Sequence, residues 1–214
     1  MHHLTGNKKH ISLPILFILL CPLLLALDID NALFLPTQFT VEDSSKLYLQ
    51  GSTNINTFRC DCKEQFSTYS MTMTETESGQ KVQFSDTKLR IPSSRFDCGN
   101  RLMNKDMFET LKGDKYPQIQ IELMDATQLS GKKMGEATDW VPMKATTAIT
   151  IAGIEKVVKM DVLGKKIAQG RFQFKGNKDI YLSDYRLEPP SPMMGLVQVN
   201  DVITIHLDLV VKVI

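Results

Sequence analysis

Histidine is nearly missing from the body of this 214-residue sequence. Three of the four histidines lie within the first ten residues, and only His206 lies further along the chain. A histidine-rich metal centre or a histidine-based catalytic set would have to be built around that single residue. His206 alternates with apolar neighbours and is expected to face outward beside Thr204 and Asp208. We therefore predict no catalytic residues, no metal ligands and no enzymatic activity.

The sequence also lacks an excess of charge of either sign. It has 25 lysines and arginines against 24 aspartates and glutamates, and its formal net charge is +1. A general nucleic-acid binder needs a surplus of basic side chains to displace counterions from phosphates. We therefore predict no nucleic-acid partner, and the composition makes no prediction of the oligomeric state.

Charge is absent from residues 11–27, which are almost wholly apolar and follow Lys8 and Lys9. A charged segment before a short apolar run is typical of a secretory signal. The run is shorter than the ~20 residues of a membrane-spanning helix, and it contains Pro14 and Pro22. We predict a signal peptide over residues 1–26, cleaved after Ala26, with an uncleaved anchor as the alternative. The mature protein is then periplasmic or extracellular.

Cysteine is scarce, and three of the four cysteines follow the signal: Cys60, Cys62 and Cys98. Disulfides persist in an oxidising compartment, and an odd number favours one bridge and one free thiol. Cys60 and Cys62 are too near in sequence to bridge comfortably. One of them, for which we choose Cys60, is expected to pair with Cys98. A redox Cys-x-Cys pair and a three-cysteine zinc site are the alternatives, but neither has the flanking groups it needs.

Alternation of apolar and polar residues dominates the chain from about residue 38 to its end. The last segment is the clearest case, because every second residue from Ile203 to Val213 is apolar. Such alternation is typical of antiparallel sheets with one dry face. A break in phase suggests a bulge near Asp86. One helix is predicted over residues 100–112, where Met103, Met107, Phe108 and Leu111 fall at helical spacing and Gly113 follows.

Roughly eight to ten strands, each with one apolar face, can form a two-sheet sandwich or close into a barrel, and a barrel removes exposed edges. The long final strand fits a tilted barrel better. We predict an all-β, lipocalin-like, extended antiparallel eight-stranded barrel with one short helix, as one domain over residues 38–214. An eight-stranded barrel is either plugged by its own side chains or holds one small ligand.

Several segments resemble the YceI-like family of exported bacterial proteins. They are residues 47–58 (LYLQGSTNINTF), 96–100 (FDCGN), 103–107 (MNKDM), 115–119 (KYPQI), 149–156 (ITIAGIEK) and 187–190 (LEPP), the last followed by Gly195 and Asp201. The resemblance implies a barrel whose cavity holds a long isoprenoid chain, polyprenyl or quinone-like, with no other cofactor. It implies a carrier or storage role without catalysis.

The ligand of such a barrel would contact whichever apolar faces point inward. The predicted lining is Phe84, Met107, Phe108, Ile119, Ile121, Phe172, Phe174, Ile205 and Leu207. Each of these residues has core packing as its alternative role. The alternative for the whole protein is a ligand-free extracellular scaffold or envelope stress barrel. Met193 and Met194, between prolines and Gly195, form either a lip that touches a membrane transiently or a loop packed on the barrel rim.

Overall fold

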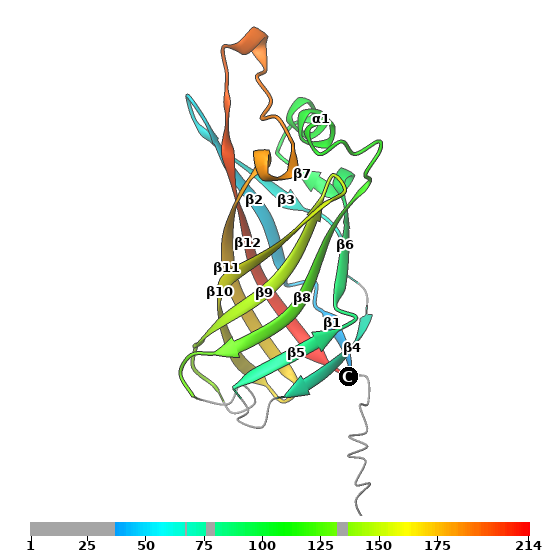
Figure 1. The fold of residues 1–214 in the computed structure, drawn as a ribbon, viewed down its shortest axis with the longest axis vertical. Coiled ribbons are helices and arrows are strands. Elements are labelled where there is room, and N and C mark those ends of the chain that lie inside the picture. Colours follow the sequence, from blue (N-terminus) through cyan, green and yellow to red (C-terminus); the bar gives the residue numbers. More distant parts are fainter. Residues whose placement is uncertain (1–36, 67, 76–79, 132–136) are drawn as a thin grey trace, which may run out of the picture. The chain divides into compact units, whose positions relative to one another are not determined.

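The computed structural model describes residues 37–66, 68–75, 80–131 and 137–214, and the predicted signal peptide lies outside these residues (Figure 1). The described chain is mostly antiparallel strand, with α1 (Arg101–Thr110) as its one α-helix. The strands are β1 (Thr37–Val41), β2 (Lys46–Thr53), β3 (Thr57–Cys62), β4 (Thr68–Glu75), β5 (Lys81–Ser85), β6 (Lys88–Pro92), β7 (Phe96–Asp97), β8 (Gln118–Gln128), β9 (Val141–Ile151), β10 (Ile154–Ala168), β11 (Arg171–Tyr181) and β12 (Val199–Val213).

Eight of these strands close into a ring. The order is β1, β4, β5, β8, β9, β10, β11 and β12, and β12 pairs back with β1. Strands β2, β3 and β7 extend the sheet from the other part of β12, while β6 pairs with β8. This arrangement confirms the predicted extended antiparallel eight-stranded barrel with one short helix.

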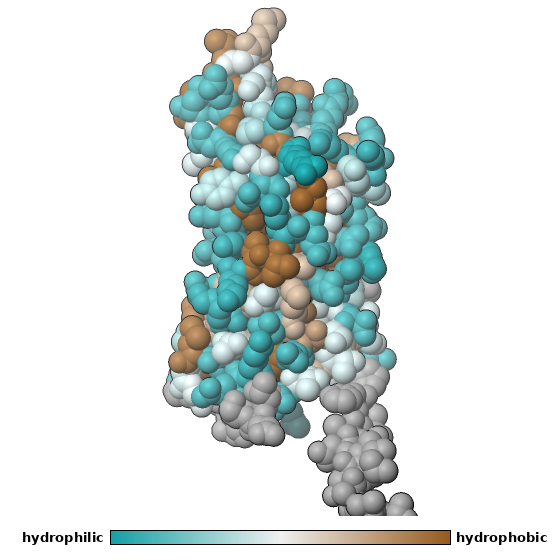
Figure 2. Space-filling model, in the orientation of Figure 1, coloured by the Kyte–Doolittle hydropathy of each residue, from teal (hydrophilic) through white to brown (hydrophobic). Residues whose placement is uncertain are grey.

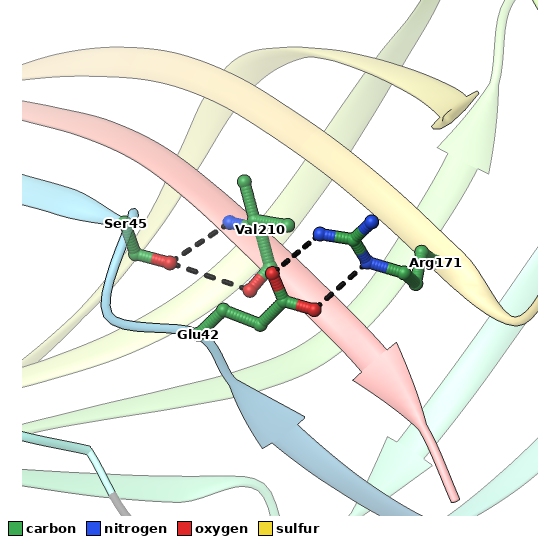
Figure 3. Close-up of polar contacts among 4 residues, drawn as sticks. All are labelled: Glu42, Ser45, Arg171 and Val210. Carbon is green, nitrogen blue, oxygen red and sulfur yellow. Dashed lines mark hydrogen bonds and ion pairs between the residues drawn. The ribbon is translucent and has the colours of Figure 1, made fainter. Parts of the chain in front are cut away.

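Two positions of the barrel wall are each occupied by a pair of short strands with a break between them. Strands β1 and β2 both pair with β12 but are separated by residues 42–45, and β5 and β6 both pair with β8. The second break lies at Asp86, where the backbone has φ +62°, close to the predicted bulge. At the first break, Glu42 accepts two hydrogen bonds from Arg171, and Ser45 bonds to the backbone of Val210 (Figure 3).

The inward faces form two separate hydrophobic clusters. The larger one includes Leu47, Leu49, Ile119, Ile203 and Ile205, which come from β2, β8 and β12. The smaller one is built on Ala126, Ala137, Val141 and Met143, with Phe84, Val162 and Phe174 packed against it. The interior of the barrel is therefore divided along its length rather than filled by one continuous core.

Helix α1 is held at the end of the barrel that carries the larger cluster (Figure 1). The side chain of Asn100 caps it by accepting a hydrogen bond from the Met103 backbone N–H at 2.9 Å. A disulfide joins Cys60 of β3 to Cys98, just before the helix, as predicted. Within the described part of the chain, no helix combines the length and the apolar character needed to cross a membrane.

Candidate functional site

A cavity of about 570 Å³ opens at the end of the barrel that carries α1. This volume lies within the usual range of small-molecule sites. The cavity is walled by strands of the barrel, by α1 and by the segment around the 3₁₀ turn η4 (Met193–Gly195). Its apolar lining residues are Leu47, Leu49, Ile55, Phe58, Ile91, Phe96, Cys98, Leu102, Met103, Met107, Leu111, Ile119, Ile121, Ile151, Ile180, Leu182, Pro190, Pro192, Met193, Val197, Val199, Ile203 and Ile205.

The inner wall is made of strand residues that share one face of the sheet. Leu47 and Leu49 are two apart on β2, and both are buried, as are Ile203 and Ile205 on β12. Side chains two apart on a strand point the same way. Leu49 pairs with Ile205 across the two strands, so the wall is continuous at this point. These branched side chains present hydrocarbon and no hydrogen-bonding group to the cavity.

The helix completes the wall on the other side. Met103, Met107 and Leu111 are four residues apart and line the cavity together, because residues at this spacing share one face of a helix. Two thioethers on this face give a surface that can adapt to a flexible ligand. Phe108 lies one residue off this face and its ring lies against Gly113, where an added Cβ would meet it at 2.2 Å.

Hydrogen bonds and the disulfide hold the helix in place over the cavity. The carboxylate of Asp97 accepts hydrogen bonds from the Gly99 backbone and from the Asn104 side chain, and these bonds lower the pKa of Asp97. Asn104 in turn accepts a hydrogen bond from the backbone N–H of Cys98 at 2.7 Å. The segment between the disulfide and the first helical turn is therefore fixed by several bonds.

Polar side chains also reach the cavity, among them Thr53 of β2 and Thr110 of α1. Asn56, Thr57 and Arg59 come from the turn between β2 and β3 and from β3, and Asn100 and Asp106 come from α1. Arg59 is engaged elsewhere, since it binds Asp61 and lies over the Tyr48 ring. The site is thus an apolar chamber with a mixed polar and apolar mouth. Within residues 37–66, 68–75, 80–131 and 137–214, no three His, Cys, Asp or Glu side chains are grouped to hold a metal ion.

The structure brings only some of the predicted lining residues together. Met107, Ile119, Ile121 and Ile205 lie on the cavity wall. Leu207 packs against the larger cluster but lies outside the wall. The remaining predicted residues lie elsewhere: Phe108 against Gly113, Phe84 and Phe174 in the smaller cluster, and Phe172 beside Phe174 at 6.5 Å between ring centroids. The role of the four wall residues in ligand binding stays a prediction.

Several residues of the wall are absent from the sequence prediction. Alternating patterns of the same kind contain the missed residues Leu47, Leu49, Ile151 and Ile203. The alternation identifies the apolar face of each strand, but it does not say how far along the barrel a residue lies. Trp140 is more than a third exposed, with the ammonium groups of Lys165 and Lys175 near its ring.

Comparison with known proteins agrees with this architecture. The crystal structure of Burkholderia cenocepacia BcnA has a TM-score of 0.55 and 16% identity, covering 78% of this chain and 95% of that one. A polyisoprenoid binding domain from Saccharophagus degradans, implicated in plant cell wall breakdown, has a TM-score of 0.56 and 12% identity, covering 81% and 97%. At these identities the likeness shows the fold. A search of curated proteins finds no significant match.

The sequence itself matches a known domain over almost all of its described length. The YceI-like domain aligns with residues 39–211, which contain every strand of the closed ring except the ends of β1 and β12. This match covers well over half of the chain. The protein therefore belongs to the family of YceI-like domain proteins.

Proposed function

We propose that this protein binds an isoprenoid-type lipid, polyprenyl or quinone-like, inside the barrel cavity and serves as its carrier or store without catalysis. The observation that carries the proposal is the apolar chamber of about 570 Å³ enclosed by β2, β12 and α1. A scaffold barrel with no ligand would be expected to have its interior filled by side chains. In the other part of the barrel, the side chains of the smaller cluster pack together.

The chemistry of the wall fits a hydrocarbon chain. An isoprenoid tail offers no hydrogen bonds, so its binding depends on apolar area and shape, at about 25 cal/mol for each Å² buried. An apolar cavity of about 150 Å³ holds one benzene, so by carbon count about 570 Å³ holds roughly four to five isoprene units. The polar side chains at the mouth, such as Asn56 and Asn100, are placed where a head group would emerge.

The comparisons support the ligand class. The chain belongs to the family of YceI-like domain proteins, and one solved protein of similar fold is described as a polyisoprenoid binding domain. Its identity to this chain is only 12%, so the wall residues of this chain must be tested in their own right.

Export of the protein is part of the same proposal. The Cys60–Cys98 disulfide fits an oxidising compartment, and the predicted signal peptide would deliver the chain there. Isoprenoid lipids are too apolar to diffuse freely through water, so a protein outside the cytoplasm that encloses the tail would keep such a lipid soluble.

Native mass spectrometry with lipid extraction from the purified protein tests this proposal. We expect a co-purifying prenyl lipid, or saturable uptake of an added quinone analogue with one isoprenoid tail per barrel. A protein that carries no lipid and takes up no analogue would instead support the ligand-free scaffold.

Two cavity-filling variants sharpen the test. Ile205→Phe and Ile121→Phe place extra carbon in the chamber from two different strands and should reduce uptake. Val157→Phe adds the same bulk at an exposed position of β10 and is the matched control, with uptake unchanged. Thermal unfolding of each variant shows whether it is folded, since overpacking costs about 1–3 kcal/mol. Normal uptake by folded variants of both wall positions would exclude this cavity as the site.

A further inference from the structure

The mouth of the cavity is surrounded by exposed apolar side chains from three separate segments. We define the lip as Ile55 in the β2–β3 turn, Leu102 on α1, and Met193, Met194 and Leu196 in and beside η4. Their exposed fractions are 69%, 64%, 67%, 105% and 73%. Figure 2 shows brown and light-brown surface at this tip, in the part that η4 forms in Figure 1. Large apolar residues gathered on the surface in this way mark an interaction site.

The lip is continuous with the inner wall of the cavity. Ile55, Leu102 and Met193 are exposed to solvent and also line the cavity. Apolar side chains therefore extend from the chamber to the outside. A hydrocarbon tail could leave a second apolar phase and enter the chamber without crossing water, provided that this phase touches the lip.

Charge is excluded from two of the three lip segments. No charged residue occurs in residues 47–58 or in residues 189–200, although 23% of the whole sequence is charged. Charged side chains are costly in the apolar part of a bilayer, whereas Met, Leu and Ile are favourable there. A partner recognised by charge complementarity would have no counterpart on these two segments.

The backbone holds two of the lip segments in place. Figure 1 shows the segment with η4 projecting past α1, with the β2–β3 hairpin at the same end of the barrel. Asn54 joins the two: its backbone N–H donates to the Gln198 carbonyl, its side-chain amide donates to the Leu196 carbonyl, and its Oδ1 accepts from the Gln198 N–H, at 3.0–3.1 Å. Met193 and Met194 both have positive φ, at 56° and 57°, which turns this segment sharply at its tip. Projecting apolar points suit insertion into a fluid phase better than docking on a rigid protein surface.

From these observations we propose that the lip inserts into the surface of a lipid bilayer and aligns the cavity mouth with it, so that the lipid tail passes directly between membrane and barrel. This inference rests on the proposed lipid binding, and it names the partner of the same site. Because charged residues are absent from two of the three lip segments, the contact depends on apolar insertion and does not require anionic lipid.

Vesicle flotation with the purified protein tests the proposal. We expect the protein to float with neutral phosphatidylcholine vesicles, and about as well when phosphatidylglycerol is added. The double variant Met194→Ser/Leu196→Ser should lose about tenfold or more in apparent vesicle affinity, because two inserting side chains are removed. Neither residue lines the cavity. The double variant Val157→Ser/Leu163→Ser, exposed on β10, is the control and should float like the unchanged protein.

A second measurement separates this proposal from the proposed function. Uptake of a quinone analogue from detergent should be the same in the lip variant and the unchanged protein, while transfer of the analogue from vesicles should slow about tenfold in the lip variant only. The membrane proposal is overturned if the unchanged protein does not float, if it floats only with anionic lipid, or if the lip variant floats equally well. In that case recognition of a protein becomes the explanation of the lip. Loss of uptake from detergent by every form of the protein would instead contradict the proposed function.

Discussion

Cys60 of β3 is bonded to Cys98, which immediately precedes the segment that caps α1, with 3.9 Å between their Cα atoms. The bond links the barrel wall to the helix that covers the cavity, and both cysteines are buried. The disulfide therefore has two effects, one on global stability and one on the position of the helix over the cavity.

Replacement of both cysteines by alanine should destabilise the protein. The bond closes a loop with a sequence separation of 38, for which the chain-entropy model gives about 4 kcal/mol. Denaturant unfolding with and without reductant measures the effect. Reductant should lower the midpoint of the unchanged protein but not that of the double variant, and equal midpoints for both proteins without reductant would contradict the expectation.

Cys62 should be a poorly reactive thiol. It is partly buried against the larger cluster, and this burial raises its pKa above the ordinary value of a cysteine. A higher pKa leaves less thiolate at a given pH, and the thiolate is the reacting form. The pH profile of alkylation by iodoacetamide should lie at higher pH in the folded protein than in the unfolded one. A profile at or below that of the unfolded chain would show an activated thiol instead.

Glu42→Gln should lower the free energy of unfolding, by an amount that depends on pH. Glu42 accepts hydrogen bonds from Arg171 at 2.8 and 2.7 Å across the break between β1 and β2 (Figure 3). The hydrogen bond to Arg171 is the main reason that the pKa of Glu42 lies below its usual 4.5. A lowered pKa in the folded state gives stability that is present above the unfolded pKa and is lost as pH falls through the folded pKa.

The two proteins should therefore differ in denaturant midpoint at pH 7 and converge as the pH is lowered below 4. Glu109→Gln removes a more exposed carboxylate, which pairs with Lys105 on α1, and is the control with little effect at either pH. A constant difference between the Glu42 variant and the unchanged protein at all pH values would show that its effect is not electrostatic.

Tyr185→Phe should leave the protein at least as stable. Tyr185 is buried in the larger cluster, and its hydroxyl has no hydrogen-bond partner among the described residues. A buried hydroxyl without a partner costs about 1–3 kcal/mol, so its removal should raise the free energy of unfolding by about 1 kcal/mol. Burial, with a smaller contribution from Asp184, raises the pKa of Tyr185 to about 12.

Spectrophotometric titration should show an ionisation near pH 12 in the unchanged protein that is lost in the variant. A clear loss of stability in Tyr185→Phe would mean that the hydroxyl makes a bond that stabilises the folded state.

The fold could be predicted because the local signals agree with one another. Alternation along the final strand identifies its inward face, and Asn100 and Gly113 mark the two ends of the helix. The odd number of cysteines indicates one disulfide bridge. Each signal depends on neighbours in the sequence, and an antiparallel barrel is built largely from consecutive strands.

The site was only partly predictable. Alternation tells which face of a strand is apolar, but not how far along the barrel a residue lies. Ile205 and Phe174 are both on inward faces, yet the first lines the cavity and the second belongs to the smaller cluster. Ile55 lies in a turn without periodicity, so no pattern could place it at the mouth. Met193 lies in an irregular segment, where only the flanking prolines and Gly195 suggested a lip.

Calorimetric titration with isoprenoid alcohols of increasing length tests the central claim most directly. Affinity should rise with each unit while the tail fills the chamber and then level off at roughly four to five isoprene units, because the volume of the chamber is then used up. The Ile205→Phe variant should level off at a shorter chain. Absence of saturable binding at every length, or an affinity independent of chain length, would contradict the account.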